Sequence, residues 1–178
     1  GLGVSGANLS GYGCAGMSNV AYGLAMQELE RGDSGLRSFA SVQGSLCMYP
    51  ILAYGAEEQR TRWLPPMARG EAIGCFGLTE ADFGSNPGGM RTRARRDGDG
   101  WILEGTKIWI TNGGFADVFT VFARTSPPNE KAKPRITALL VERGMGVRSG
   151  PDEHKLGIRG SSTTEVYFED VKVPAGNV

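Results

Sequence analysis

The segment CFGLTEADFGSNPGGM, residues 75–90, has the composition of a binding loop. A strand-like run ends in LTE at residues 78–80 and is followed by Gly84 and Ser85. Such a loop exposes backbone N–H groups and a hydroxyl, which suit an anion or a ring edge rich in acceptors. From this segment alone, a glycine-rich hairpin connection is the simpler interpretation.

The segment GTKIWITNGG, residues 105–114, places an aromatic ring beside a hydroxyl. Trp109 stands between Ile108 and Ile110, and Thr111 follows before the chain turns. A tryptophan with β-branched neighbours is ordinarily a core residue of a strand. A flat amphipathic cofactor needs the same two groups. Its ring can stack on the indole, and its heteroatoms can form hydrogen bonds with the hydroxyl. Both interpretations stay open at this point.

The letters GYGCAG at residues 11–16 match the G-x-G-x-x-G pattern of dinucleotide-binding proteins. That pattern works only where a strand precedes the glycines and a helix follows them. The preceding residues, GLGVSGANLS, contain no buried-strand run, and Asp33 falls at a predicted helix end rather than on a second strand. We therefore interpret residues 11–16 as a flexible entry loop.

The remaining polar candidates favour structural roles. Arg91, Arg93 and Arg95 alternate along one predicted strand, which indicates a solvated basic edge more than a site for a CoA phosphate. His154 stands alone in a polar turn, without a partner for metal or triad chemistry. Glu80 is interpreted as a hydrogen-bond acceptor rather than a base. The sequence therefore predicts no catalytic residue and no metal ligand in this chain.

The first part of the chain has helical periodicity. Three helices are expected, within residues 18–35, 36–49 and 56–70. Ser18 is the predicted N-cap of the first, Pro50 ends the second, and Pro65 with Pro66 closes the third. One face of the first helix is apolar and consists of Val20, Ala21, Leu24, Ala25 and Leu29.

After Gly70 the pattern changes to short β-branched and aromatic runs separated by turn residues. Strands are expected within residues 72–80, 90–95, 101–111, 118–125, 136–142 and 163–173, with turns such as 97–100 and 126–134 between them. The predicted fold is α+β, with a helical segment over 1–72 followed by a small antiparallel β-barrel or sandwich over 73–178.

Composition excludes several function classes. The chain has 178 residues, and its 19 basic and 19 acidic side chains give a net charge of +0, which favours neither nucleic acid nor an anionic membrane. The three cysteines have no paired spacing, which favours a reducing compartment. The start at Gly1 and the end at Val178 are expected to be those of a fragment.

Taken together and in this order, the segments resemble the acyl-CoA dehydrogenases. The matching stretches are GCFGLTEADFGS, WITN at 109–112, FART at 122–125 and KLGIRGSSTTEVYFEDVKVP at 155–174. The resemblance implies a helical domain and a β-domain that bind FAD together. It implies FAD contacts for Phe76, Gly77, Leu78, Thr79, Gly84, Ser85, Trp109, Ile110 and Thr111, with the Thr111 hydroxyl near the flavin N5 and Ser85 also near the substrate.

Within that family, residues 11–46 look most like the glutaryl-CoA dehydrogenases. The resemblance implies that Arg37 and Ser38 bind the distal carboxylate of a dicarboxylic acyl chain, with Ser41 in the same wall. An arginine suits this role because it forms a bidentate, charge-assisted clamp. A solvated surface position for Arg37 is the alternative. From about residue 119 onward, the sequence looks more like the straight-chain and very-long-chain acyl-CoA dehydrogenases.

The implied reaction is α,β-dehydrogenation of an acyl-CoA thioester, with the catalytic glutamate in a C-terminal helical domain that is absent from this chain. The implied partners are acyl-CoA, an electron-transferring flavoprotein and other copies of the chain in a homotetramer. The expected location is the bacterial cytoplasm or the mitochondrial matrix. The alternatives are a medium- to long-chain fatty acyl-CoA dehydrogenase and a non-catalytic paralogue that serves as a binding or assembly module.

Overall fold

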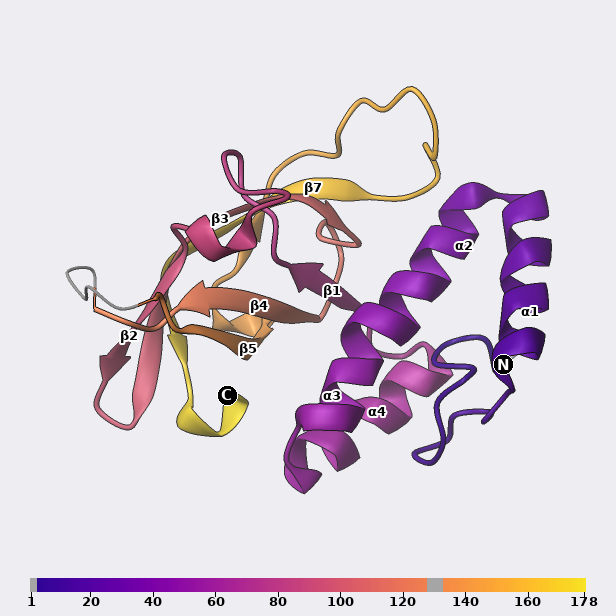
Figure 1. Ribbon diagram of the computed structural model, residues 1–178, viewed down its shortest axis with the longest axis horizontal. Coiled ribbons are helices and arrows are strands. Elements are labelled where there is room, and N and C mark those ends of the chain that lie inside the picture. Colours follow the sequence, from indigo (N-terminus) through magenta and orange to yellow (C-terminus); the bar gives the residue numbers. More distant parts are fainter. Residues whose placement is uncertain (1–2, 128–132) are drawn as a thin grey trace.

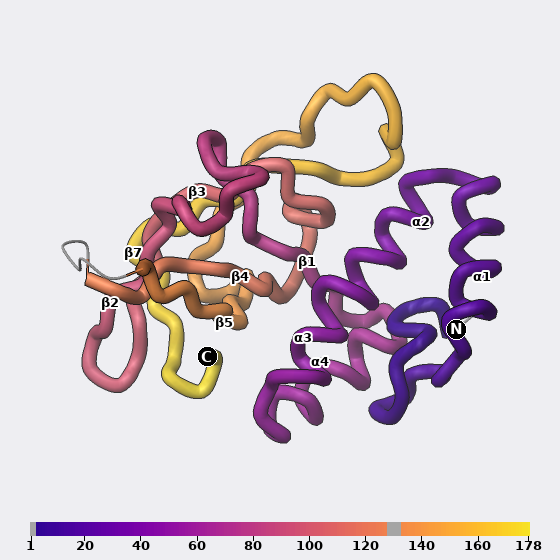
Figure 2. Tube along the Cα trace, in the orientation of Figure 1, coloured from indigo at the N-terminus to yellow at the C-terminus, as the bar shows by residue number. Residues whose placement is uncertain are grey.

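The computed structural model describes residues 3–127 and 133–178, so part of the predicted turn at 126–134 lies outside the described residues. The helices are α1 (Asn19–Gly32), α2 (Ser34–Ser41), a π-helical segment (Val42–Met48), α3 (Tyr49–Tyr54) and α4 (Glu57–Arg69). The strands are β1 (Gly74–Gly77), β2 (Arg93–Asp97), β3 (Gly100–Thr111), β4 (Val118–Arg124), β5 (Ile136–Glu142), β6 (Arg148–Ser149) and β7 (Thr163–Val173). Figure 1 shows the helices on one side and the sheet on the other, and the trace in Figure 2 shows the same division along the chain.

Helix α1 begins as predicted, because the Ser18 hydroxyl accepts a hydrogen bond from the Ala21 N–H at 3.2 Å. The predicted buried face is wrong in part. Val20 and Leu24 are exposed, and Met26 is buried instead. Helix α1 packs mainly on α2 and lies away from the sheet (Figure 1), so most of its residues are exposed.

The two predicted proline stops are also wrong. The chain stays helical through Pro50, which is the second residue of α3 and follows directly on the π-helical segment. Helix α4 contains Pro65 and Pro66 and ends only at Arg69. Its inner side buries Leu64 and Met67, and this packing keeps the segment helical despite the lost hydrogen bonds.

The expected order of a helical segment followed by a small barrel-like sheet is confirmed, and the sheet is curled into a half-barrel that is mixed rather than antiparallel throughout. Its order is β1-β4-β2-β3-β7-β6, with β5 paired to β4. Strand β1 pairs with β4 in parallel, and β2 meets β4 in parallel at Arg93 and Arg124. The β2–β3 hairpin lies between β1 and β4 in sequence, so no tight turn forces these two strands to run antiparallel.

A buried joint connects the helices to the sheet. The side-chain amide of Gln43 donates to the Met67 and Ala72 carbonyls at 3.2 and 2.8 Å, and its oxygen accepts from the Gly74 N–H at 2.7 Å. Gln43 is fully buried, so these bonds satisfy its polar atoms where water is excluded. The start of β1 is therefore held against the π-helical segment.

The glycine pattern at residues 11–16 is an entry loop, as predicted. Residues 3–18 contain turns and no strand, and Gly11, Gly13 and Gly16 adopt positive φ angles of 82°, 84° and 64°. Among the described residues, no helix is both long and apolar enough to cross a bilayer. Within the same residues, no three metal-binding side chains gather.

Candidate functional site

The two segments that could hold a flat cofactor meet at one hollow. Its lining comes from the π-helical segment, the end of β1 and the end of β3, and consists of Val42, Leu46, Phe76, Thr79, Trp109, Ile110 and Thr111. Its volume of about 170 Å³ is below that of a typical small-molecule pocket. The hollow is therefore too small to enclose a flat cofactor by itself.

A bulge in β3 directs Trp109 out of the sheet. The pairing of β3 with β7 shifts register between Lys107 and Ile110, and Trp109 has a φ of +58°. A bulky residue rarely adopts this left-handed conformation, which costs about 1–3 kcal/mol. The Trp109 side chain is 58% exposed, which excludes the interpretation as a core tryptophan. Its indole is free to face a ligand.

Direct bonds hold the two segments together below the hollow. The Ile108 N–H donates to the Thr79 carbonyl at 2.9 Å, and the Lys107 ammonium donates to the Leu78 carbonyl at the same distance. After the bulge, the Asn112 amide donates to the Gly74 carbonyl at 3.2 Å. These bonds fix the position of β3 against residues 74–79.

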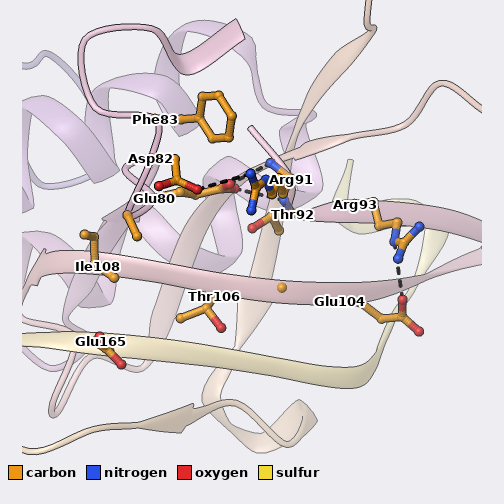
Figure 3. A pocket seen from close by; sticks show the side chains of 12 residues that line it. Glu80, Asp82, Phe83, Arg91, Thr92, Arg93, Glu104, Thr106, Ile108 and Glu165 are labelled. Carbon is orange, nitrogen blue, oxygen red and sulfur yellow. Dashed lines mark hydrogen bonds and ion pairs between the residues drawn. The ribbon is translucent and has the colours of Figure 1, made fainter. Parts of the chain in front are cut away.

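Glu80 is fully engaged as an acceptor. Its carboxylate accepts from the Arg91 and Thr92 N–H groups at 2.6 and 2.9 Å (Figure 3) and from the Lys107 ammonium at 2.8 Å. Burial raises its pKa, but the hydrogen bonds from Lys107, Thr92 and Arg91 outweigh this and hold the pKa below its ordinary value. These contacts confirm the prediction that Glu80 is a hydrogen-bond acceptor.

The glycine-rich loop is not part of this hollow. Gly84 and Ser85 are exposed and do not line it, and Gly77 is buried in the sheet. Phe83 lines a second hollow, with Glu80 and Ile108 (Figure 3). The cofactor and substrate contacts predicted for this loop stay predictions, as do those predicted for the residues that line the hollow.

The basic edge is solvated, as predicted. Three arginines are exposed and paired with carboxylates, as the pairs Arg91–Asp82, Arg93–Glu104 and Arg95–Asp170 at 3.2, 3.6 and 3.9 Å. Figure 3 shows the first two pairs at the rim of the second hollow. Exposed pairs of this kind contribute little stability. His154 is also exposed, in an irregular loop.

The predicted substrate residues form one polar cluster on α2. The Arg37 Nε donates to the Glu30 carboxylate at 2.6 Å, and its Nη1 lies 3.5 Å from the Ser41 hydroxyl, which in turn donates to the Ser38 carbonyl. The hydrogen bonds from Arg37 and Ser34 lower the pKa of Glu30. The Arg37 side chain is 34% exposed, so it is only partly a surface residue.

Helix α2 leads from this cluster to the hollow. Ser38 and Val42 are four residues apart, so they lie on one helical face, and Val42 lines the hollow. Phe39 stacks on Phe115 with ring centroids 6.5 Å apart, which holds α2 beside the loop that follows Thr111. Arg37 precedes Ser38 by one residue and faces Glu30 on α1, so Ser38 is the predicted substrate residue that shares the helical face of Val42.

Sequence reasoning missed three residues of this site. Val42 and Leu46 line the hollow, and their spacing of four within a helix next to Arg37 is a signal that was available. Lys107 connects the two segments, and its signal is a charged residue beside the apolar run Ile108–Ile110 of the same strand. A buried lysine requires a partner, and Glu80 is the acidic residue in the neighbouring segment.

Two family models cover nearly the whole chain. The acyl-CoA dehydrogenase N-terminal domain matches residues 1–71, and the acyl-CoA dehydrogenase middle domain matches residues 75–171. This chain belongs to the acyl-CoA dehydrogenase family. Its helical part and curled sheet are the N-terminal and middle parts of that fold.

Individual family members support the assignment. The chain is 42% identical over 167 residues to the human mitochondrial short-chain specific acyl-CoA dehydrogenase, which covers 93% of this chain and 40% of the relative. The chain is 56% identical to a glutaryl-CoA dehydrogenase from Mycobacterium smegmatis that was solved in complex with FADH2, with a TM-score of 0.92. The match covers 99% of this chain and 44% of the glutaryl-CoA dehydrogenase chain. The chain is also 41% identical to butyryl-CoA dehydrogenase from Megasphaera elsdenii, with a TM-score of 0.90. This match covers 99% of this chain and 47% of the butyryl-CoA dehydrogenase chain. This acyl-CoA dehydrogenase chain thus spans less than half the length of these relatives.

Proposed function

We propose that this chain supplies the flavin wall and part of the acyl pocket of an FAD-dependent acyl-CoA dehydrogenase. The observation that carries the proposal is the hollow at which Phe76 and Thr79 meet Trp109, Ile110 and Thr111. An exposed indole, a neighbouring hydroxyl and apolar side chains fit an amphipathic tricyclic ring. FAD, when bound, accepts the hydride that leaves the β-carbon of the substrate.

The chain's own residues bind and orient in this proposal. Trp109 stacks on the ring, and the Thr111 hydroxyl donates to its polar edge. Gly84 and Ser85 contact the FAD phosphate or the substrate from the exposed loop. The base that removes the α-proton is assigned to the C-terminal helical domain, because the Glu80 carboxylate is already held by Lys107 and two backbone N–H groups.

The proposed substrate is glutaryl-CoA, which is oxidised and decarboxylated to crotonyl-CoA and carbon dioxide. The Arg37 cluster supports this choice. Nε of Arg37 is bound to Glu30, whereas the outer guanidinium edge carries further N–H donors that suit a bidentate carboxylate contact. Ser38 and Ser41 supply hydroxyls to the same carboxylate, and the 56% identity to a glutaryl-CoA dehydrogenase agrees with the proposal.

A straight-chain fatty acyl-CoA is the second candidate. The contact between Arg37 and Glu30 favours it, because an arginine already paired at 2.6 Å needs no carboxylate from a substrate. The apolar Val42 and Leu46 in the wall of the hollow also suit a hydrocarbon chain. In either case, we propose a homotetramer in the bacterial cytoplasm or mitochondrial matrix that passes electrons to an electron-transferring flavoprotein.

Replacing Arg37 separates the two substrates. In the full-length, FAD-loaded protein, Arg37→Ala should lower kcat/KM for glutaryl-CoA by about 100-fold or more, because the substrate carboxylate loses its charged partner in a partly desolvated site. The value for butyryl-CoA should change by less than about threefold. Steady-state kinetics with both substrates measures this. Arg31→Ala is the matched control, since Arg31 is exposed and pairs only with Glu28 among the described residues.

Two results would contradict the proposal. Equal losses of kcat/KM with both substrates would show that Arg37 does not bind a substrate carboxylate, which would favour the straight-chain substrate. A full-length protein that binds no FAD and is inert to acyl-CoA would support the non-catalytic module instead.

A further inference from the structure

Lys107 is a charged side chain in the interior of the protein. Its side chain is 0% exposed, and its ammonium contacts the Leu78 carbonyl, the Glu80 carboxylate and, at 3.8 Å, the Met90 sulfur. Glu80 is 6% exposed, so both charges of the pair lie out of water. Glu80 lines the second hollow, and neither residue of the pair lines the hollow beside Trp109.

Stability alone does not account for this pair. Removing two ions from water costs several kcal/mol for each, and apolar residues of similar volume are often as stabilising or more so. Burial lowers the pKa of Lys107, whereas the Glu80 carboxylate raises it, and the first effect prevails. A buried pair that is expensive to form requires another explanation, and the best attested is selection of one local geometry.

The pair fixes how far residues 78–80 are shifted along β3. Leu78, Thr79 and Glu80 are consecutive, and each is bonded to Lys107 or Ile108, which are consecutive on β3. The strained bulge at Trp109 begins at the next residue. Strain of this kind persists only where the surroundings over-determine the conformation.

The same carboxylate also closes the loop that follows. Glu80 accepts from the Arg91 and Thr92 N–H groups, which lie at the far end of loop 81–90 (Figure 3). One buried carboxylate thus connects β1, the base of the glycine-rich loop and β3 through Lys107. A sliding of any one of these elements would leave charges unpaired in the interior, which is costly.

We propose that Lys107 is a positioning residue for the flavin, because its ammonium and the Glu80 carboxylate hold Thr79 and the Trp109 bulge at a single offset. This inference rests on the proposed FAD site. It assigns to the buried pair a role in flavin geometry that is separate from its role in folding.

The test compares three variants of the full-length protein, Lys107→Met, Glu80→Gln and the double variant. Each single variant leaves one buried charge without its partner and should lower the thermal unfolding temperature. The double variant leaves neither charge, so its unfolding temperature should return toward that of the wild type. Glu104→Gln is the control, because Glu104 pairs with Arg93 at an exposed position on the same strands.

Flavin measurements then separate positioning from folding. We expect the Kd of FAD to rise about tenfold or more in the double variant, with a changed visible spectrum and reduction potential of the bound flavin. The unfolding temperature of the same variant should be close to that of the wild type. Glu104→Gln should match the wild type in all these readouts.

The outcomes are distinguishable. A double variant that recovers both stability and wild-type flavin properties would overturn the inference, because the pair would then be structural only. Single variants that fold and bind flavin with an unchanged Kd, spectrum and potential would also overturn it. If the wild-type protein itself binds no FAD, the proposed function fails, and the inference fails with it.

Discussion

Glu80 and Lys107 show how a buried charge depends on its partners. Each hydrogen bond that Glu80 accepts favours its ionised form, so its pKa is lower in the folded than in the unfolded chain. The unfolded chain therefore takes up a proton first as the pH falls. The stability from this carboxylate is complete above about pH 4.3 and is lost as the pH falls through the folded pKa.

The lowered pKa of Glu80 predicts how the stability of the protein depends on pH. The free energy of unfolding of the full-length protein should fall as the pH drops below the ordinary glutamate pKa of about 4.3, and Glu80→Gln should reduce that slope. Denaturant unfolding at a series of pH values measures it, with Glu104→Gln as a control at an exposed pair. Identical acid slopes in the wild type and Glu80→Gln would show that the carboxylate is not ionised in the way described.

Residue types alone left the role of Trp109 and Thr111 open between a core strand and a cofactor contact, and the family resemblance favoured the second. Both residues line the hollow. Simple alternation along β3 puts Lys107 and Trp109 on the same face. The bulge between Lys107 and Ile110 instead buries Lys107 and exposes Trp109, and its register shift depends on β7, which lies far along the chain.

Among the secondary structure elements, local signals were reliable and tertiary ones were not. The start of α1 at Ser18 was predictable because the cap is a contact between residues three apart. The continuation of α4 through Pro65 and Pro66 was not, because it depends on packing of Leu64 and Met67. The parallel pairing of β1 with β4 joins strands separated by the β2–β3 hairpin, and no local pattern encodes it.

Two glycines in different surroundings test how closely the π-helical segment packs against β1. A Cβ at Gly74 would lie 2.6 Å from the Cys47 Cβ and 2.9 Å from the Met67 Cε, so Gly74→Ala should destabilise the protein by about 1–3 kcal/mol. Gly23 is exposed in α1 with nothing within 4 Å of an added Cβ, so Gly23→Ala should stabilise by about 0.5–1 kcal/mol.

Denaturant unfolding of the two variants beside the wild type checks both signs. The pair is informative because the substitution is the same and only the surroundings differ. A Gly74→Ala protein as stable as the wild type would mean that the helices and β1 are less closely packed than described.

In the molecule as a whole, the helical part and the sheet meet where the candidate site lies. Gln43 bonds the π-helical segment to Gly74, and Val42 from the same segment lines the hollow beside Thr79 and Trp109. On the other side, the loop around Gly160 reaches the start of α2 near Asp33 and Gly35 (Figure 1). The site is therefore a product of the tertiary fold rather than of one motif.

The central claim is that the segments 76–79 and 109–111 form one wall for a flavin ring. The measurement that tests it most directly is the position of the flavin in a crystal structure of the full-length protein with FAD. The account predicts that the ring stacks against Trp109, lies within hydrogen-bond reach of the Thr111 hydroxyl and contacts Phe76 or Thr79. A flavin bound elsewhere, or in contact with only one of the two segments, would contradict it.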